Sequence, residues 1–380
     1  MIDRKKFLQH ITNHFEVHSL CALLGPRQCG KTTLSKEYAR QFQGEVHVFD
    51  LENPTHLARL ETPMLALSSL KGLVILDEIQ RRPELFPILR VLVDEGDRKF
   101  LILGSASRDL IQQSSETLAG RIGYLELPPF HLEEGIEDET LLWVRGGFPK
   151  SYLAKKESSS FLWRENYIRT FLERDIPSLG FSIAPQQLRR FWMMLAHCHG
   201  NLFNASEIGR SLSISDHTAK KYLDILSGTF MVRSLSPWFE NTTKRQVKTP
   251  KIYFRDAGIF HALMGLHTLE SIQTHPKLAA SWEGFALEQV IQKLDVYEGE
   301  SFFWRTHAGA ELDLLILKEG KRLGFEFKYT EAPKVSSSMH SAFESLHLNH
   351  LFLIYPGENR FLLKENITAV GLKPFIKESL

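Results

Sequence analysis

The sequence has few cysteines and no pattern that would pair them. Cys21, Cys29 and Cys198 are odd in number and form no C-x-x-C motif. A disulfide-stabilised scaffold and a structural zinc site are both disfavoured, because each needs cysteines in matched sets. This usage fits a reducing compartment, and we predict a cytoplasmic protein.

The sequence also lacks the apolar segments that a membrane protein needs. No run approaches the roughly 18 consecutive apolar residues of a spanning helix. The first residues, MIDRKKFLQHITNHF, carry charges and have no apolar stretch of the kind found in signal peptides. We therefore expect no membrane partner.

An excess of either charge is absent as well. Lys and Arg number 46 against 45 Asp and Glu, which gives a formal net charge of +1. A charge this small excludes a global field that draws the protein onto nucleic acid, so any DNA contact must come from a local patch. With 43 % apolar and 24 % charged residues among 380, the composition is that of a soluble globular chain, and the length favours two or three domains of about 150 residues.

Short apolar runs do occur, at the spacing of a parallel α/β sheet. Helical stretches separate them in the first third of the chain, as parallel strands require. The pattern becomes helical between 161 and 199, and the polar stretch AKKESSS at 154–160 is predicted to be a linker. The expected strands are 19–24, 46–51, 73–76, 100–103 and 122–127.

The stretch GPRQCGKTT follows the first of these runs and matches the pattern G-x-x-x-x-G-K-[ST]. Its glycines let the backbone fold around phosphates, while loop amides and a helix N-terminus supply donors. Lys31 is predicted to reach the β- and γ-phosphates of ATP, and Thr32 to ligate Mg²⁺. The predicted nucleotide-binding residues are Gly25, Pro26, Arg27, Gln28, Cys29, Gly30, Lys31, Thr32 and Thr33.

A second apolar run, GLVILDEIQ at 72–80, ends in two carboxylates. Asp77 is predicted to hold the Mg²⁺ and Glu78 to polarise the attacking water, as in a Walker B motif. Ser105 in GSAS is a candidate sensor of the γ-phosphate, with an ordinary strand-end serine as the alternative. Arg121 in LAGR is a candidate sensing arginine that acts within its own chain or on a neighbour, with a structural salt bridge as the alternative.

These motifs together resemble the AAA+ branch of P-loop ATPases, in which a strand is inserted between the Walker A and Walker B strands. More specifically, the chain is similar to a prokaryotic family of AAA+-type ATPases with a C-terminal domain of unknown function. The resemblance implies ATP and Mg²⁺ as cofactors and ATP hydrolysis as the activity, and ring-forming relatives leave a homo-oligomer open. Its motifs span nearly the whole chain: GPRQCGKTTL, LDEIQ, GSAS, LAGRIGYLEL, GGFP, YIRTFLERDI, KTPKIYFRDAGI and FFWRTHAGAELDLLI.

Residues 201–238 have the rhythm of a helix-turn-helix. ASEIGRSL is predicted to be one helix and DHTAKKYLDILSG a second, capped by Ser215 or Asp216, with FMVRSL and KIYFR as wing strands. The second helix is near neutral, so the basic tip NTTKRQVKTPK is the better phosphate-binding candidate. DNA contact and a purely structural winged helix both stay open. The basic residues of the tip are Lys244, Arg245, Lys248 and Lys251.

The last region resembles the PD-(D/E)xK nuclease core in its order of helix, three strands, helix and strand. Asp313 and Glu326 are candidate ligands of a divalent cation, and Lys328 is a candidate for stabilising a phosphate or orienting water. Glu283 or Glu288 on the preceding helix would complete the site. The residue before the aspartate is leucine rather than the proline of the nuclease signature. A charged ladder in which Lys328 neutralises the two carboxylates is the alternative.

We therefore predict an α/β P-loop ATPase domain with a parallel sheet at 1–153, a helical and winged-helix domain at 154–270, and an α/β nuclease-like domain at 271–380. Three functions stay open. The chain is an ATP-hydrolysing switch or motor with DNA as a partner, an ATP-regulated metal-dependent nuclease, or a nucleotide-binding scaffold whose partner is a protein.

Overall fold

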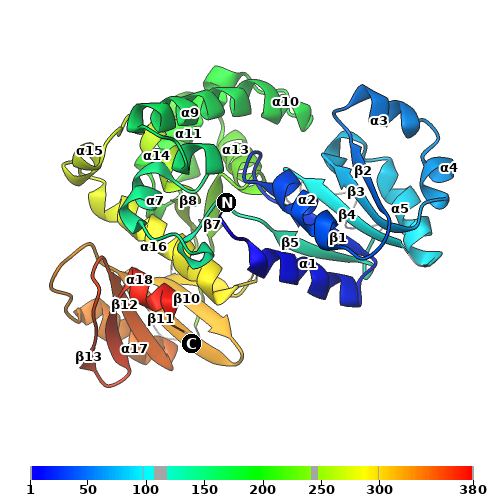
Figure 1. Cartoon of the computed structure of the whole chain (residues 1–380). Coiled ribbons are helices and arrows are strands. Elements are labelled where there is room, and N and C mark those ends of the chain that lie inside the picture. Colours follow the sequence, from blue (N-terminus) through cyan, green and yellow to red (C-terminus); the bar gives the residue numbers. More distant parts are fainter. Residues whose placement is uncertain (1, 97, 107–117, 241–246, 298, 379–380) are drawn as a thin grey trace. The chain divides into compact units, whose positions relative to one another are not determined.

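A computed structural model describes residues 2–96, 98–106, 118–240, 247–297 and 299–378 (Figure 1). The chain divides into two compact units, and each draws on separate stretches of sequence. The first unit contains Met1–Phe130, Arg169–Pro185 and Asp224–Met231. The second unit contains His131–Ile168, Gln186–Leu223 and Val232–Leu380.

The first unit is built on a five-stranded sheet in the order β2-β3-β4-β1-β5. Every neighbouring pair is parallel, which confirms the predicted parallel α/β sheet. β4 lies between β1 and β3, so the inserted strand of the AAA+ arrangement is present. The strands are β1 (Leu20–Leu24), β2 (Val46–Asp50), β3 (Gly72–Asp77), β4 (Arg98–Gly104) and β5 (Ile122–Glu126).

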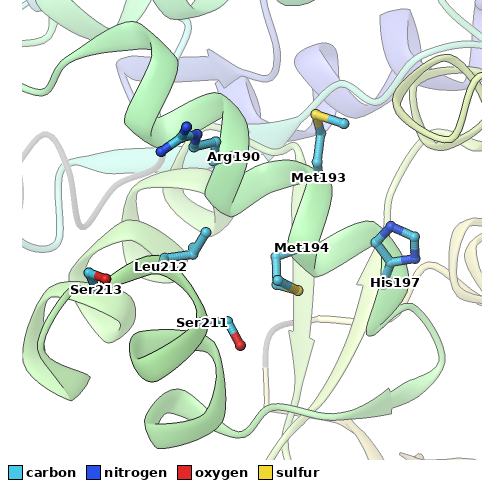
Figure 2. A pocket seen from close by; sticks show the side chains of 7 residues that line it. All are labelled: Arg190, Met193, Met194, His197, Ser211, Leu212 and Ser213. Carbon is cyan, nitrogen blue, oxygen red and sulfur yellow. The ribbon is translucent and has the colours of Figure 1, made fainter.

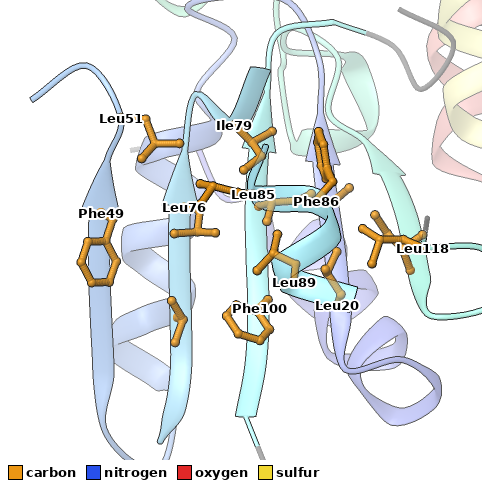
Figure 3. Close-up of a cluster of buried hydrophobic side chains, with 14 of the residues drawn as sticks. Leu20, Phe49, Leu51, Leu76, Ile79, Leu85, Phe86, Leu89, Phe100 and Leu118 are labelled. Atoms are coloured by element: carbon orange, nitrogen blue, oxygen red, sulfur yellow. The ribbon is translucent and has the colours of Figure 1, made fainter. Parts of the chain in front are cut away.

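Helices cover both faces of this sheet, because successive strand side chains point to opposite sides. Cys21 and Leu23 pack with α1 (Lys5–Val17) and α2 (Lys31–Gln41) on one face. On the other face, Leu20 and Phe100 of the strands belong to one buried cluster with Leu89 of α5, as Figure 3 shows. The helices that contribute to this second cluster are α3 (Pro54–Arg59), α4 (Pro63–Ser68) and α5 (Leu85–Asp94).

The predicted linker at 154–160 is wrong in its second half. Helix α9 begins at Glu157 and continues to Thr170, so the second half of AKKESSS is helical. Ser160 is fully buried and shares a hydrogen bond of 2.8 Å with Ser151. Small hydroxyl side chains here satisfy one another in a tight contact, so their polarity did not indicate exposure.

The predicted helix pair is present as α12 (Ala205–Leu212) and α13 (Asp216–Gly228). Ser215 caps the second helix by accepting a hydrogen bond from the amide of Thr218 at 3.0 Å. The two strands expected after the helix pair are present, in an antiparallel sheet of order β6-β8-β7; a winged helix stays a prediction. These strands are β6 (Asn201–Leu202), β7 (Val232–Leu235) and β8 (Lys251–Phe254).

The end of the chain forms a six-stranded mixed sheet in the order β13-β14-β12-β11-β10-β9. Its elements follow the predicted succession of helix, three strands, helix and strand: α16 (Leu278–Leu294), β9 (Ser301–Arg305), β10 (Glu311–Lys318), β11 (Lys321–Phe327), α17 (Ser337–Leu346) and β12 (His350–Tyr355). The chain then adds β13 (Arg360–Lys364), β14 (Ile367–Gly371) and α18 (Leu372–Lys377).

The remaining helices are short, apart from one of 13 residues, α11. No helix in the described part of the chain is both long and apolar enough to cross a membrane. The remaining helices are α7 (Glu139–Arg145), α8 (Pro149–Tyr152), α10 (Ile176–Ser178), α11 (Pro185–His197), α14 (Ala257–Leu263) and α15 (Leu269–Gln273). Short 3-10 turns occur at Ile79–Arg81 and Leu132–Glu134, and a π-helical turn at Phe171–Asp175.

Candidate functional site

The glycine-rich loop joins the end of β1 to the start of α2. Gly30 has φ 108°, a left-handed conformation that favours glycine, and it directly precedes the helix. A side chain on Gly25 would place its Cβ 2.2 Å from the carbonyl oxygen of Leu127, so this position has no room for one. The first amides of α2 have no acceptor within the helix and are available to an anion.

Lys31 and Thr32 begin α2 and connect the loop to the end of β3. The buried ammonium of Lys31 donates to the carbonyls of Gly25 at 2.8 Å and Pro26 at 2.9 Å. The hydroxyl of Thr32 donates to Asp77 at 2.7 Å. Burial raises the pKa of Asp77, an effect that the hydrogen bond from Thr32 opposes. The structure therefore brings the two predicted Mg²⁺ ligands into direct contact.

Glu78 follows Asp77 in a left-handed conformation with φ 61°. A non-glycine residue held there stores backbone strain, which is common at functional sites. Its carboxylate accepts a hydrogen bond from Gln80, and Gln80 also donates to Ser105 at 3.0 Å. The predicted water-polarising and sensing residues are therefore joined through Gln80, whose role the sequence pattern did not indicate.

Arg27 is a loop residue surrounded by carboxylates. Its guanidinium lies 2.5 Å from Asp175, 2.7 Å from Glu52 and 3.7 Å from Glu78. Burial alone would lower the pKa of Arg27, but these three negative charges outweigh it and raise the pKa. The interaction with Asp175 spans 148 positions of sequence, so spacing alone could not predict it.

Arg4 supports the loop from its other side. Its buried guanidinium donates to the carbonyls of Cys29 at 3.1 Å and Pro128 at 2.9 Å. Cys29 is itself buried among apolar residues of α1, α2 and the sheet. The loop backbone is thus fixed to the end of the sheet by a residue that no motif singles out.

Arg121 precedes β5 and forms a two-pronged ion pair with Asp94. Its Nε and Nη2 atoms donate to the two carboxylate oxygens at 2.6 and 3.0 Å. Both side chains are well exposed, so this pair contributes little to stability. A phosphate-sensing role for Arg121 stays a prediction.

The residues of this site fit a nucleoside triphosphate with Mg²⁺. The loop combines an ammonium, free helix N-terminal amides and glycines that allow close approach of the backbone. A hydroxyl and a carboxylate meet where the hard cation would need oxygen ligands. Each predicted loop residue from Gly25 to Thr33 lies on this turn or on the first turn of α2.

A second group of charges lies in the second unit, around the buried Lys251 of β8. Its ammonium is 3.6 Å from Glu283 and 3.4 Å from Asp313, and it also pairs with Glu311. Tyr253 donates to Glu283 at 2.6 Å. One buried cation thus pairs with carboxylates from two elements, α16 and β10.

Glu326 and Lys328 lie beside this group. The ammonium of Lys328 is 2.8 Å from Glu326. Burial, aided by the charge of Asp313, raises the pKa of Glu326 to about 8 and that of Glu283 to about 7. The three residues predicted for a nuclease-like site are therefore close neighbours, together with one of the two candidate glutamates of α16.

The surroundings of Asp313 do not fit a divalent cation. One of its oxygens faces Lys251, and the other accepts a hydrogen bond from the amide of Phe327 at 3.1 Å. No group of three or more His, Cys, Asp and Glu side chains within the described ranges has an arrangement suited to a metal ion. In the alternative of a charge ladder Lys328 neutralises both carboxylates, whereas the structure pairs Lys328 with Glu326 and places Lys251 against Asp313.

The sequence predicts Lys251 as a phosphate contact at the wing tip, and this is wrong, because its side chain is buried in the ion-pair group. Lys244 and Arg245 lie outside the described residues, and Lys248 is exposed. Glu288 pairs with Arg233 at 2.8 Å, which leaves Glu283 as the glutamate that faces Asp313.

A cavity of about 520 Å³ lies in the second unit, between α11 and the end of α12 (Figure 2). Met193, Met194 and His197 line it from α11. Ser211 and Leu212 line it from the end of α12, and Ser213 from the turn that follows. None of its lining residues belongs to the phosphate loop. It therefore takes no part in the nucleotide site.

Comparison with protein families divides the chain into three matches. Residues 17–136 match the AAA domain family, and this match contains the phosphate loop, Asp77 and Glu78. Residues 136–270 match a domain of unknown function, DUF8612, and residues 278–375 match another, DUF4143.

Two mycobacterial proteins are similar to almost the whole chain. They are the uncharacterized proteins Rv2008c of Mycobacterium tuberculosis and Mb2031c of Mycobacterium bovis. Each is 46 % identical over 373 residues, which cover 97 % of this chain and 84 % of the relative. Among solved structures, the Walker-type ATPase PABY2304 of Pyrococcus abyssi has a TM-score of 0.50 at 15 % identity, over 70 % of this chain and 96 % of that one. This likeness concerns the fold.

We expect Lys31→Ala to lower the affinity for ATP about ten-fold or more, because a charge-assisted contact to phosphate contributes roughly 1.5–3 kcal/mol. Calorimetric titration of the full chain measures this affinity. Lys36→Ala is the matched control, since Lys36 is exposed on the same helix. Equal affinities of wild type and Lys31→Ala would reject the assignment of this loop.

We expect Lys251→Met to lower the free energy of unfolding by roughly 3–5 kcal/mol, because buried carboxylates would lose their cation. Denaturant titration of the full chain tests this, with Lys248→Met as the exposed control. A variant as stable as the control would mean that Lys251 does not neutralise the group.

Proposed function

We propose that this chain hydrolyses ATP and acts as a nucleotide-dependent switch. The chain belongs to the same family as the two mycobacterial proteins and is an ATP-binding protein of AAA type. The observation that carries the proposal is the 2.7 Å hydrogen bond between Thr32 and Asp77. It joins the start of α2 to the end of β3, which is where hydrolysis requires a phosphate loop and a carboxylate to meet.

The residues divide the chemistry among themselves. Lys31, now donating to loop carbonyls 2.8 and 2.9 Å away, would exchange these acceptors for the β- and γ-phosphate oxygens. Glu78 would accept a proton from the attacking water and orient it, while Gln80 donates to its carboxylate and also to the hydroxyl of Ser105. The first amides of α2 would bind phosphate oxygens.

Thr32 and Asp77 are the residues that would hold Mg²⁺, directly or through its water shell. The cation would supply charge to neutralise the β- and γ-phosphate oxygens. Hard cations such as Mg²⁺ prefer oxygen ligands. The hydroxyl of Thr32 and the carboxylate of Asp77 are 2.7 Å apart, which supports this pair of ligands.

We expect the second unit to bind the partner on which the switch acts, and DNA is one candidate for that partner. His217, Lys220 and Lys221 are exposed at the start of α13, where a helix-turn-helix reads nucleic acid. Asp216 and Asp224 reduce the net charge of this helix, and Lys251 is withdrawn from the wing. The charge pattern therefore favours a protein partner over strong backbone binding to DNA.

We propose that the predicted nuclease-like domain at 271–380 has no nuclease activity. The specific observation is that Lys251 pairs with Asp313 while Lys328 pairs with Glu326. A lysine of this chain thus lies against each of the two carboxylates that a metal-dependent nuclease would use. The group then ties β8 to α16, β10 and β11 as a structural element.

The first experiment compares steady-state ATP hydrolysis by wild type and Glu78→Gln, without DNA and with duplex or single-stranded DNA at low salt. We expect Glu78→Gln to keep its affinity for ATP and to lose turnover about 100-fold, since general-base catalysis contributes roughly 10²–10⁴-fold. Glu61→Gln, an exposed residue of the same unit, is the control. Normal turnover in Glu78→Gln would contradict its role, and a rate raised by DNA would favour DNA over a protein as the partner.

A cleavage assay tests the C-terminal unit. We expect wild type to leave plasmid and linear DNA intact in the presence of Mg²⁺ or Mn²⁺, with and without ATP, because lysines lie against Asp313 and Glu326 where the cation would bind. Cleavage by wild type that disappears in Asp313→Ala would overturn this part of the proposal and establish an ATP-regulated nuclease.

A further inference from the structure

Arg27 connects three carboxylates of the first unit in a defined way. Its Nη1 atom binds Asp175 at 2.5 Å, while its Nη2 atom binds Glu52 at 2.7 Å and lies 3.7 Å from Glu78. The two short contacts are hydrogen-bonded ion pairs, and the third is too long for a hydrogen bond. Arg27 therefore lies within reach of the water-polarising carboxylate without holding it.

Asp175 reaches this site from a separate stretch of chain. It ends the π-helical turn Phe171–Asp175 within Arg169–Pro185, which belongs to the first unit although the chain on both sides of it belongs to the second. π-Helical turns are rare and occur often at functional sites. Phe171, Leu172 and Ile176 are buried around the turn, so the position of the carboxylate is set by apolar packing and is not free to adjust.

Glu78 has its own set of restraints. Gln80 donates to its carboxylate, and the strained backbone at φ 61° fixes where the side chain begins. A guanidinium that moved by about 1 Å toward Glu78 would form a tight ion pair with it, and a shift of this size at a catalytic group can cost about 100-fold in rate. What restrains Arg27 therefore determines whether Glu78 is available to a water molecule.

We propose that Asp175 is a positioning residue of ATP hydrolysis: with Glu52 it anchors Arg27 and so keeps Glu78 available for the attacking water. The proposal rests on the proposed function, because it assumes the role of Glu78. It adds that the segment Arg169–Pro185 sets the hydrolysis rate. Loss of the Asp175 contact would release Arg27 onto Glu78 and slow turnover without releasing the nucleotide.

The test uses full-length Asp175→Asn, with Glu173→Gln as the matched control. Glu173 loses the same charge on the same turn, but its side chain is exposed. We expect Asp175→Asn to lower kcat about ten-fold or more while the calorimetric affinity for ATP changes less than two-fold. Asp175→Glu restores the anchoring charge and should recover part of the rate. A merely structural role would instead lower the melting temperature and move affinity and kcat together.

Two further variants keep the test decisive. Glu52→Gln removes the second anchor of Arg27 and should lower kcat in the same direction even if Asp175→Asn does not fold. Adding Asp175→Asn to Arg27→Gln should have no further effect, because the residue that it anchors is gone.

The outcomes separate this proposal from the proposed function. If wild type and Glu173→Gln hydrolyse ATP and Asp175→Asn matches them, the positioning role is wrong and the ATPase assignment stands. Additive losses in the double variant would likewise overturn the relay through Arg27. If wild type and Glu173→Gln bind ATP but show no turnover, the proposed hydrolysis fails, and the positioning role fails with it.

Discussion

The chemistry of the nucleotide site depends on the parallel direction of five strands. Because β1 and β3 run the same way, their carboxyl ends reach the same edge of the sheet, and the loop after one can meet the carboxylates after the other. The contact between Thr32 and Asp77 is the direct result. β4 separates the two strands and brings Ser105 to the same edge. A reversal of any one of these strands would remove its residues from the site.

The sequence predicts this unit well because its signals are local. Each of the five strands appears within two residues of its expected bounds, and the Walker residues lie at strand ends where alternation of strand and helix places them. The phosphate loop is recognised because glycine, lysine and threonine are needed at fixed spacing. The contact between Arg27 and Asp175 could not be predicted from local signals, because Asp175 is 148 positions away. It lies on a π-helical turn, which no periodicity of the sequence indicates.

The errors of the sequence analysis concern polar residues that the fold buries. Lysine in a basic tip and serine in a polar run normally face water. Lys251 is buried because carboxylates of α16 and β10 surround it, and Ser160 because Ser151 completes its hydrogen bond. Burial of such groups is decided by partners distant in sequence, which composition does not contain. The domain boundaries near 153 and 270 remain predictions.

Cys29 gives the phosphate loop a property beyond its affinity for phosphate. Its sulfur lies beneath the loop, closed off by α1, α2 and the sheet, and its carbonyl is clamped by Arg4. A thiol reagent reaches a sulfur buried in this way only when the packing around it opens. The rate at which Cys29 is labelled would therefore report how often the packing around the phosphate loop opens.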